Sequence, residues 1–117
     1  MKRLAVLDVV GLTRGLLGPG MPRLAKFAER HEVASFRPAF PAVTTTAQST
    51  YLTGSPPSGH GIVGNGWYDR DYAETLFWKQ SNHLVQGEKL WERLRKERAN
   101  YRCAKMFWWY NMYSGAD

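Results

Sequence analysis

The short apolar run at residues 4–10 (LAVLDVV) constrains the fold of this 117-residue chain more than any other segment. It is rich in branched residues, Gly11 ends it, and it is shorter than a typical helix, so it predicts a buried strand. Asp8 interrupts the run, and no small-residue cleavage pattern follows, which argues against a signal peptide. No uncharged apolar run approaches the roughly 20 residues that span a membrane. We therefore expect a cytoplasmic protein with no membrane partner.

Strand and helix patterns alternate along the rest of the chain. Apolar residues recur at helical spacing in residues 21–31 and 86–98, and a polar helix is expected from the threonines near Thr44 to Gly54. Short apolar runs predict further strands at residues 33–36, 75–78 and 102–109. Such alternation predicts an α/β fold with a mostly parallel sheet and helices on both faces.

The net charge of +6 is compatible with an acidic partner. However, the lysines and arginines of residues 86–98 are interleaved with glutamates, which is typical of a solvated helix face. Dedicated nucleic-acid binders concentrate like charge instead, so we expect no nucleic-acid partner. One cysteine, Cys103, excludes an internal disulfide and gives no sign of an oxidising compartment.

The polar segment after Pro41 carries the candidate chemistry. A threonine at the start of a helix is often a cap or a surface hydroxyl. The same position places the Thr44 hydroxyl beside free backbone N–H groups that can hold a phosphate, and the helix dipole favours negative charge there. Thr44 is therefore our candidate nucleophile.

Five sequence pieces in fixed order carry a family resemblance. They are FPAVT at residues 40–44, TYLTG at 50–54, Pro57, HGIVGN at 60–65 and WYD at 67–69. The ordered set resembles the nucleotide pyrophosphatase/phosphodiesterase family of the alkaline phosphatase superfamily. The resemblance implies a metal-dependent hydrolase of phosphodiester or pyrophosphate bonds that forms a phosphothreonine intermediate. It also implies a phosphorylated small molecule as substrate, with nucleotides among the candidates.

The resemblance further implies roles for three residues. Thr44 would be the nucleophile and a metal ligand, Asn65 would bind the substrate's phosphoryl group, and Asp8 would be a second metal ligand. Two zinc ions are expected, with most of their ligands beyond residue 117. The match of His60 to the family triplet implies a structural hydrogen bond.

Two of these roles have structural alternatives. Asp8 is the nearest carboxylate to Gly11, whereas Val10 precedes that glycine directly, and Asp8 can equally cap a backbone turn at the end of a strand. Asn65 lies in a glycine loop, where asparagine is common because it tolerates left-handed conformations. The resemblance also implies an asparagine three residues after the nucleophile to bind a phosphoryl oxygen, where this chain has Ala47, so Gln48, Thr45 or Asn65 would have to substitute for it.

The last residues form an aromatic cluster at 108–113. An exposed cluster of this kind marks an interface or the missing remainder of a core. We therefore expect residues 1–117 to be the N-terminal portion of one alkaline-phosphatase-like catalytic domain, truncated, inactive by itself and prone to associate. The alternative is a small basic non-catalytic module that binds an acidic partner.

Overall fold

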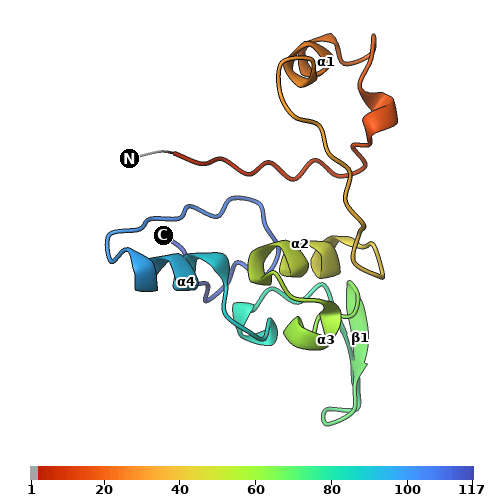
Figure 1. Ribbon diagram of the computed structural model, residues 1–117. Coiled ribbons are helices and arrows are strands. Elements are labelled where there is room, and N and C mark those ends of the chain that lie inside the picture. Colours follow the sequence, from red (N-terminus) through yellow and green to blue (C-terminus); the bar gives the residue numbers. More distant parts are fainter. Residues whose placement is uncertain (1–2) are drawn as a thin grey trace. The chain divides into compact units, whose positions relative to one another are not determined.

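The computed structural model describes residues 3–117, which form two compact units. The first unit ends at Arg37 and the second runs from Pro38 to Asp117. The first unit contains a 3-10 turn, η1 (Arg14–Leu16), and a helix, α1 (Pro22–Ala28) (Figure 1). Proline at the first position suits a helix start because the missing N–H would have had no partner there. The predicted helix at residues 21–31 is therefore confirmed, with shorter bounds.

Residues 4–10 do not form the predicted strand. They are extended but pair with no other described segment, and Leu7 and Val10 are 85% and 80% exposed. A strand requires a neighbouring strand for its backbone hydrogen bonds, which local apolarity cannot supply. The strand predicted at residues 33–36 is absent for the same reason.

The strand predicted at residues 102–109 is also wrong. Within it, Phe107 has φ 58, and Tyr110 just beyond has φ 54. A left-handed residue interrupts the extended backbone that a strand needs. Among residues 3–117 the sheet is a two-stranded antiparallel hairpin, and the mostly parallel sheet stays a prediction.

Three helices build the second unit, and Figure 1 shows all of them. α2 (Thr44–Thr53) begins at the expected threonine and ends at Gly54, whose φ of 65 is left-handed. α3 (Pro57–His60) packs against α2, and α4 (Leu90–Glu97) follows a 3-10 turn, η2 (Asn82–Leu84). α2 and α4 confirm the helix predictions, with α4 starting four residues later than expected. No helix in the described part of the chain has the length and apolarity needed to cross a bilayer.

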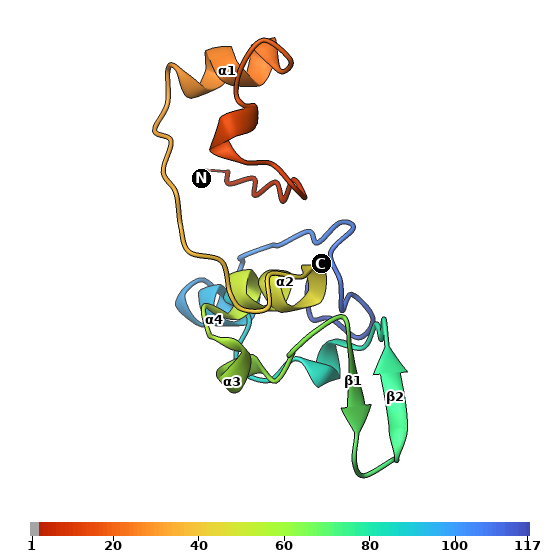
Figure 2. The ribbon, with the colours of Figure 1, turned by 90° about the vertical axis from the view of Figure 1, so that its right-hand side faces the viewer.

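The hairpin consists of β1 (Gly66–Asp69) and β2 (Glu74–Phe77), drawn as paired arrows in Figure 2. Gly66 is opposite Phe77 in the register. A Cβ atom at Gly66 would lie 2.1 Å from the Phe77 ring, so this position requires glycine. The close packing at Gly66 therefore fixes the residue at which the hairpin begins, which directly follows Asn65.

A small apolar core supports the loop between α3 and β1. Ile62, Val85 and Tyr110 are buried together, and Trp67, Leu84 and Trp109 pack on them. Ile62 lies within this loop and is 1% exposed. Burial of one such side chain contributes roughly 1.5–3 kcal/mol, so the loop is held to the unit near its middle.

Candidate functional site

The N-terminus of α2 presents one accessible threonine. Thr44 is the first residue of α2 and is half-buried, whereas Thr45 and Thr46 are both 0% exposed. No hydrogen bond joins the Thr44 hydroxyl to any residue that the structure describes. Of the three consecutive threonines, Thr44 is thus the one whose hydroxyl can meet a substrate.

The backbone at this helix end keeps donors available. Val43, the residue before α2, has no side-chain oxygen to cap the helix. The N–H groups of Thr44 and Thr46 have no partner among residues 3–117, whereas the N–H of Thr45 is taken. Unpaired N–H groups and the positive end of the helix dipole together favour an anion at this position.

Asn65 lies directly against this helix end, although it is 20 residues away from Thr45 in sequence. Its Oδ1 accepts the Thr45 N–H at 3.0 Å and the Thr45 hydroxyl at 3.0 Å. This hydroxyl has a single proton, which is shared with the Gly64 carbonyl, 2.7 Å from Oγ1. Asn65 therefore caps α2 from a distant loop, which supplies the oxygen that Val43 lacks.

These contacts fix the orientation of the Asn65 amide. A backbone N–H donates only to an acceptor, so the atom facing Thr45 must be the carbonyl oxygen. The amide nitrogen, Nδ2, then points away from Thr45 and has no partner among the described residues. Asn65 thus combines a structural half, Oδ1, with a donor half that is available to a ligand.

Thr45 and Gln48, the alternative phosphoryl-binding groups, both face the interior. The Thr45 side chain is fully buried, and Gln48 is 7% exposed, with its Oε1 accepting the N–H of Trp109 at 2.7 Å. Neither side chain can leave these positions without breaking a buried hydrogen bond. The geometry therefore favours Asn65 over both.

Asp8 belongs to the first unit, where it lies exposed on the extended segment. Its role as a metal ligand stays a prediction. Within residues 3–117, no three histidine, cysteine, aspartate or glutamate side chains gather into a group that could hold a metal ion. Structural and catalytic zinc sites use at least three protein ligands, so the described residues alone do not assemble one.

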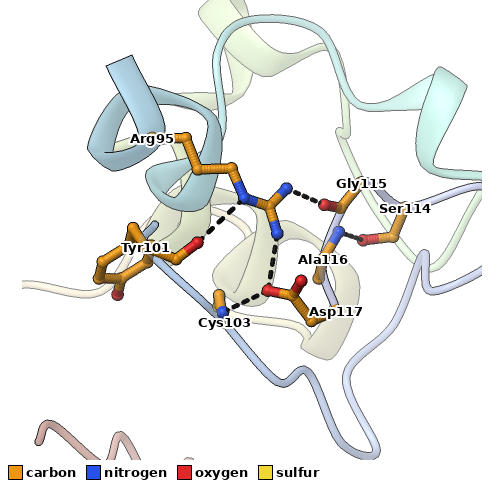
Figure 3. Close-up of polar contacts among 7 residues, drawn as sticks. All are labelled: Arg95, Tyr101, Cys103, Ser114, Gly115, Ala116 and Asp117. Carbon is orange, nitrogen blue, oxygen red and sulfur yellow. Dashed lines mark hydrogen bonds and ion pairs between the residues drawn. The ribbon is translucent and has the colours of Figure 1, made fainter. Parts of the chain in front are cut away.

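The basic helix α4 has few free cations to offer an acidic partner. Arg95 donates to the carbonyls of Tyr101 and Gly115 and, at 2.7 Å, to the Asp117 carboxylate (Figure 3). The N–H of Cys103 meets the same carboxylate at 2.7 Å. Lys96 forms an ion pair with Glu88 at 2.6 Å, whose hydrogen bond raises the lysine's pKa. These charges serve the chain's own contacts.

Lys105 is a perturbed group that no sequence pattern signals. Its Nζ donates to the Tyr110 carbonyl at 2.7 Å and lies 5.2 Å from the centre of the Trp91 ring. Burial lowers the pKa of Lys105 to about 8. The contacts made by Lys105 lie among core aromatics and do not include Thr44 or Asn65, so we assign it no part in the site.

Comparison with known proteins identifies the family. The family model for type I phosphodiesterase/nucleotide pyrophosphatase matches residues 4–117. The chain belongs to this family. The resemblance found in the sequence is thereby confirmed, and the family's α/β fold is consistent with the predicted fold class.

Two curated relatives support the assignment. The chain is 32% identical over 94 residues to an uncharacterized pyrophosphatase/phosphodiesterase of Schizosaccharomyces pombe, which covers 74% of this chain and 19% of the relative. It is 43% identical over 37 residues to the alkaline phosphatase PafA of Elizabethkingia meningoseptica, covering 32% of this chain and 7% of that protein. The matches thus extend over less than one fifth of either relative's length. No solved structure matches the chain.

Proposed function

We propose that the whole protein hydrolyses phosphodiester or pyrophosphate bonds through a covalent intermediate on Thr44. The observation that carries the proposal is the accessible Thr44 hydroxyl at the N-terminus of α2, next in the chain to Thr45, whose backbone N–H donates to Asn65 Oδ1. This helix end thus offers a nucleophile, a donor for the phosphoryl oxygens and a favourable helix dipole. All three favour attack on a phosphoryl group. Membership of a phosphoric ester hydrolase family supports this assignment.

The chemistry has two steps. The substrate's phosphoryl group binds at the helix end, where the Thr44 N–H and Asn65 Nδ2 donate to its non-bridging oxygens. The Thr44 oxygen attacks phosphorus and gives up its proton, and the bond from phosphorus to the leaving oxygen breaks. The leaving group departs as an alcohol that has taken up a proton, or as a phosphate. Water then attacks the phosphothreonine, which releases the phosphoryl product and restores the Thr44 hydroxyl.

Metal ions belong to the proposal because the superfamily is generally metal-dependent. Zinc, when bound, would lower the pKa of the attacking hydroxyl and neutralise developing charge on the phosphoryl oxygens. Asp8 and Thr44 are the oxygen donors that this chain would contribute to a two-zinc centre. Further ligands would have to come from outside the described residues, so we propose that this segment alone is inactive and forms the N-terminal portion of one catalytic domain.

A matched set of threonine variants tests the nucleophile in the whole protein. Thr44→Ala should lower the turnover of a chromogenic phosphodiester by several orders of magnitude, because the attacking oxygen is lost. Thr44→Ser should retain part of the activity. Thr53→Ala, on the same helix and away from the site, should leave activity near the wild-type level.

Acid quenching during turnover provides a direct readout. Labelled phosphate should be recovered on Thr44 in the wild type and be absent from Thr44→Ala. Wild-type turnover by Thr44→Ala, or label on Thr45 or Thr46, would refute the assignment. The same protein, assayed with and without added zinc after chelation, tests the proposed metal dependence independently.

A further inference from the structure

His60 is a buried histidine with both ring nitrogens in defined contacts. It ends α3 and is 0% exposed. Its Nδ1 accepts the N–H of Ile62 at 3.1 Å, so Nδ1 carries no proton. The proton therefore sits on Nε2, which donates to the Thr50 hydroxyl at 3.0 Å, and Thr50 donates in turn to the Thr46 carbonyl at 2.9 Å.

This chain of hydrogen bonds ties the loop after α3 to the middle of α2. The other end of the same loop is tied to the first turn of α2 through Asn65 and Thr45. Residues 60–65 thus run antiparallel to α2, with His60 at Thr50 and Asn65 at Thr45. The His60 end of the loop is held to α2 by one hydrogen bond, and the other end by the contacts of Gly64 and Asn65 with Thr45.

Chain length alone does not fix the path of this loop. Five helical residues, such as those from Thr45 to Thr50, rise about 7.5 Å. Five residues of extended chain can reach about 17 Å. The loop from His60 to Asn65 is therefore longer than the distance it spans. Its path is fixed by the hydrogen bonds of His60, the burial of Ile62 and the contacts of Asn65.

We propose that His60 is a positioning residue for Asn65, setting the point from which the amide nitrogen of Asn65 reaches the phosphoryl group. His60 acts through the loop and does not touch the substrate. The proposal rests on the proposed function, in which Asn65 binds phosphoryl oxygens. It goes beyond a structural hydrogen bond because it predicts that the effect on catalysis disappears when Asn65 is gone.

The electrostatic setting supports a fixed, neutral ring. Burial lowers the pKa of His60, which keeps the ring neutral near pH 7 and preserves Nδ1 as an acceptor. The groups that form hydrogen bonds with His60 are uncharged: the Thr50 hydroxyl, the Ile62 N–H and, on the His60 carbonyl at 2.9 Å, the N–H of Gln86.

A double-mutant cycle in the whole protein tests the inference. Thr50→Val keeps the shape of the side chain but removes the hydroxyl that accepts the hydrogen bond from His60. Thr50→Ser keeps this hydroxyl. We expect Thr50→Val to lower kcat/KM about tenfold, which is the weight of one well-placed hydrogen bond, and Thr50→Ser to remain near wild type. In an Asn65→Ala background, Thr50→Val should change kcat/KM by less than about twofold.

Thr53→Val is the matched control. Thr53 also donates its hydroxyl to a carbonyl one turn earlier in α2, that of Ser49 at 2.8 Å, but no hydrogen bond joins it to His60. It should lower thermal stability as Thr50→Val does and leave kcat/KM unchanged. If Thr50→Val does not fold, His60→Gln provides the second variant, with the same loss of effect expected in the Asn65→Ala background.

Two outcomes separate the inference from the function on which it rests. If Asn65→Ala lowers kcat/KM but Thr50→Val has the same effect with and without Asn65, His60 is only structural and the inference is overturned. If Asn65→Ala and Thr44→Ala both keep wild-type kcat/KM, the proposed function fails first.

Discussion

Asn65→Asp should separate the structural half of the Asn65 side chain from its functional half. Oδ1 accepts the Thr45 N–H at 3.0 Å, and it shares the single proton of the Thr45 hydroxyl, also at 3.0 Å, with the Gly64 carbonyl. One full hydrogen bond contributes about 1 kcal/mol net, so Asn65→Ala should lower the free energy of unfolding by about 1–2 kcal/mol. Aspartate keeps an acceptor oxygen for these contacts and adds a negative charge at the helix N-terminus, a contribution of about 0.5–1 kcal/mol. Asn65→Asp should therefore be at least as stable as the wild type.

The activities of the two variants should rank in the opposite order, with Asn65→Asp less active than Asn65→Ala. Asn65→Asp loses the Nδ2 donor and places a carboxylate against an incoming phosphate. Loss of one donor to a transition-state oxyanion costs about 10²–10³ in kcat, and charge repulsion adds to this. The aspartate variant should thus be the more stable and the less active of the two.

Urea unfolding at pH 7 and phosphodiesterase kinetics on the whole protein, measured on both variants, provide the comparison. Equal destabilisation by alanine and aspartate would show that Oδ1 does not cap α2. Wild-type kcat/KM in Asn65→Asp would show that Nδ2 does not face the phosphoryl group.

Three further predictions concern the metal, the hairpin and a half-buried lysine. Asp8→Asn should lower the zinc content of the folded whole protein, measured by elemental analysis, and an unchanged content would assign Asp8 a structural role. Gly66→Ala should force the Phe77 ring aside and lower the free energy of unfolding by about 1–3 kcal/mol, with Ser58→Ala at an exposed position as the control in the same urea titration. The folded pKa of Lys105, about 8, lies below its ordinary value of 10.5, so the folded state disfavours the ammonium. The free energy of unfolding should therefore rise with pH between about 8 and 10.5, and Lys105→Met should lose that rise; an equal rise in both proteins would contradict the assignment.

Local signals account for what the sequence predicted correctly. The hydroxyl-rich start and glycine end of α2, the apolar face of α4 and the short apolar run of β2 are all patterns within a few residues. The strand at residues 4–10 failed because pairing is a property of two segments, and only one of them is local.

The candidate site also contains features that local sequence predicts and features that depend on distant contacts. The motif predicted Thr44 at the start of a helix, and Thr44 is the first residue of α2, whereas its role as nucleophile stays a prediction. The role of Asn65 could not be settled, because its partner, Thr45, is 20 residues away and the pair forms no periodic pattern. The buried state of Thr45 and Gln48, which removes them as phosphoryl ligands, likewise depends on packing with distant residues such as Trp109.

Because Asn65 caps α2 from a distant loop, Thr44 reaches its final orientation only after that loop has folded onto the helix. A helix of ten residues is marginal in isolation, and this one has valine where a capping side chain would normally stabilise its first turn. Its cap arrives when the loop that carries Asn65 closes, so a peptide of residues 40–54 should be largely unstructured. The orientation of the Thr44 hydroxyl is then acquired late, together with the β1–β2 hairpin, and Asn65→Ala should accelerate unfolding far more than it slows folding.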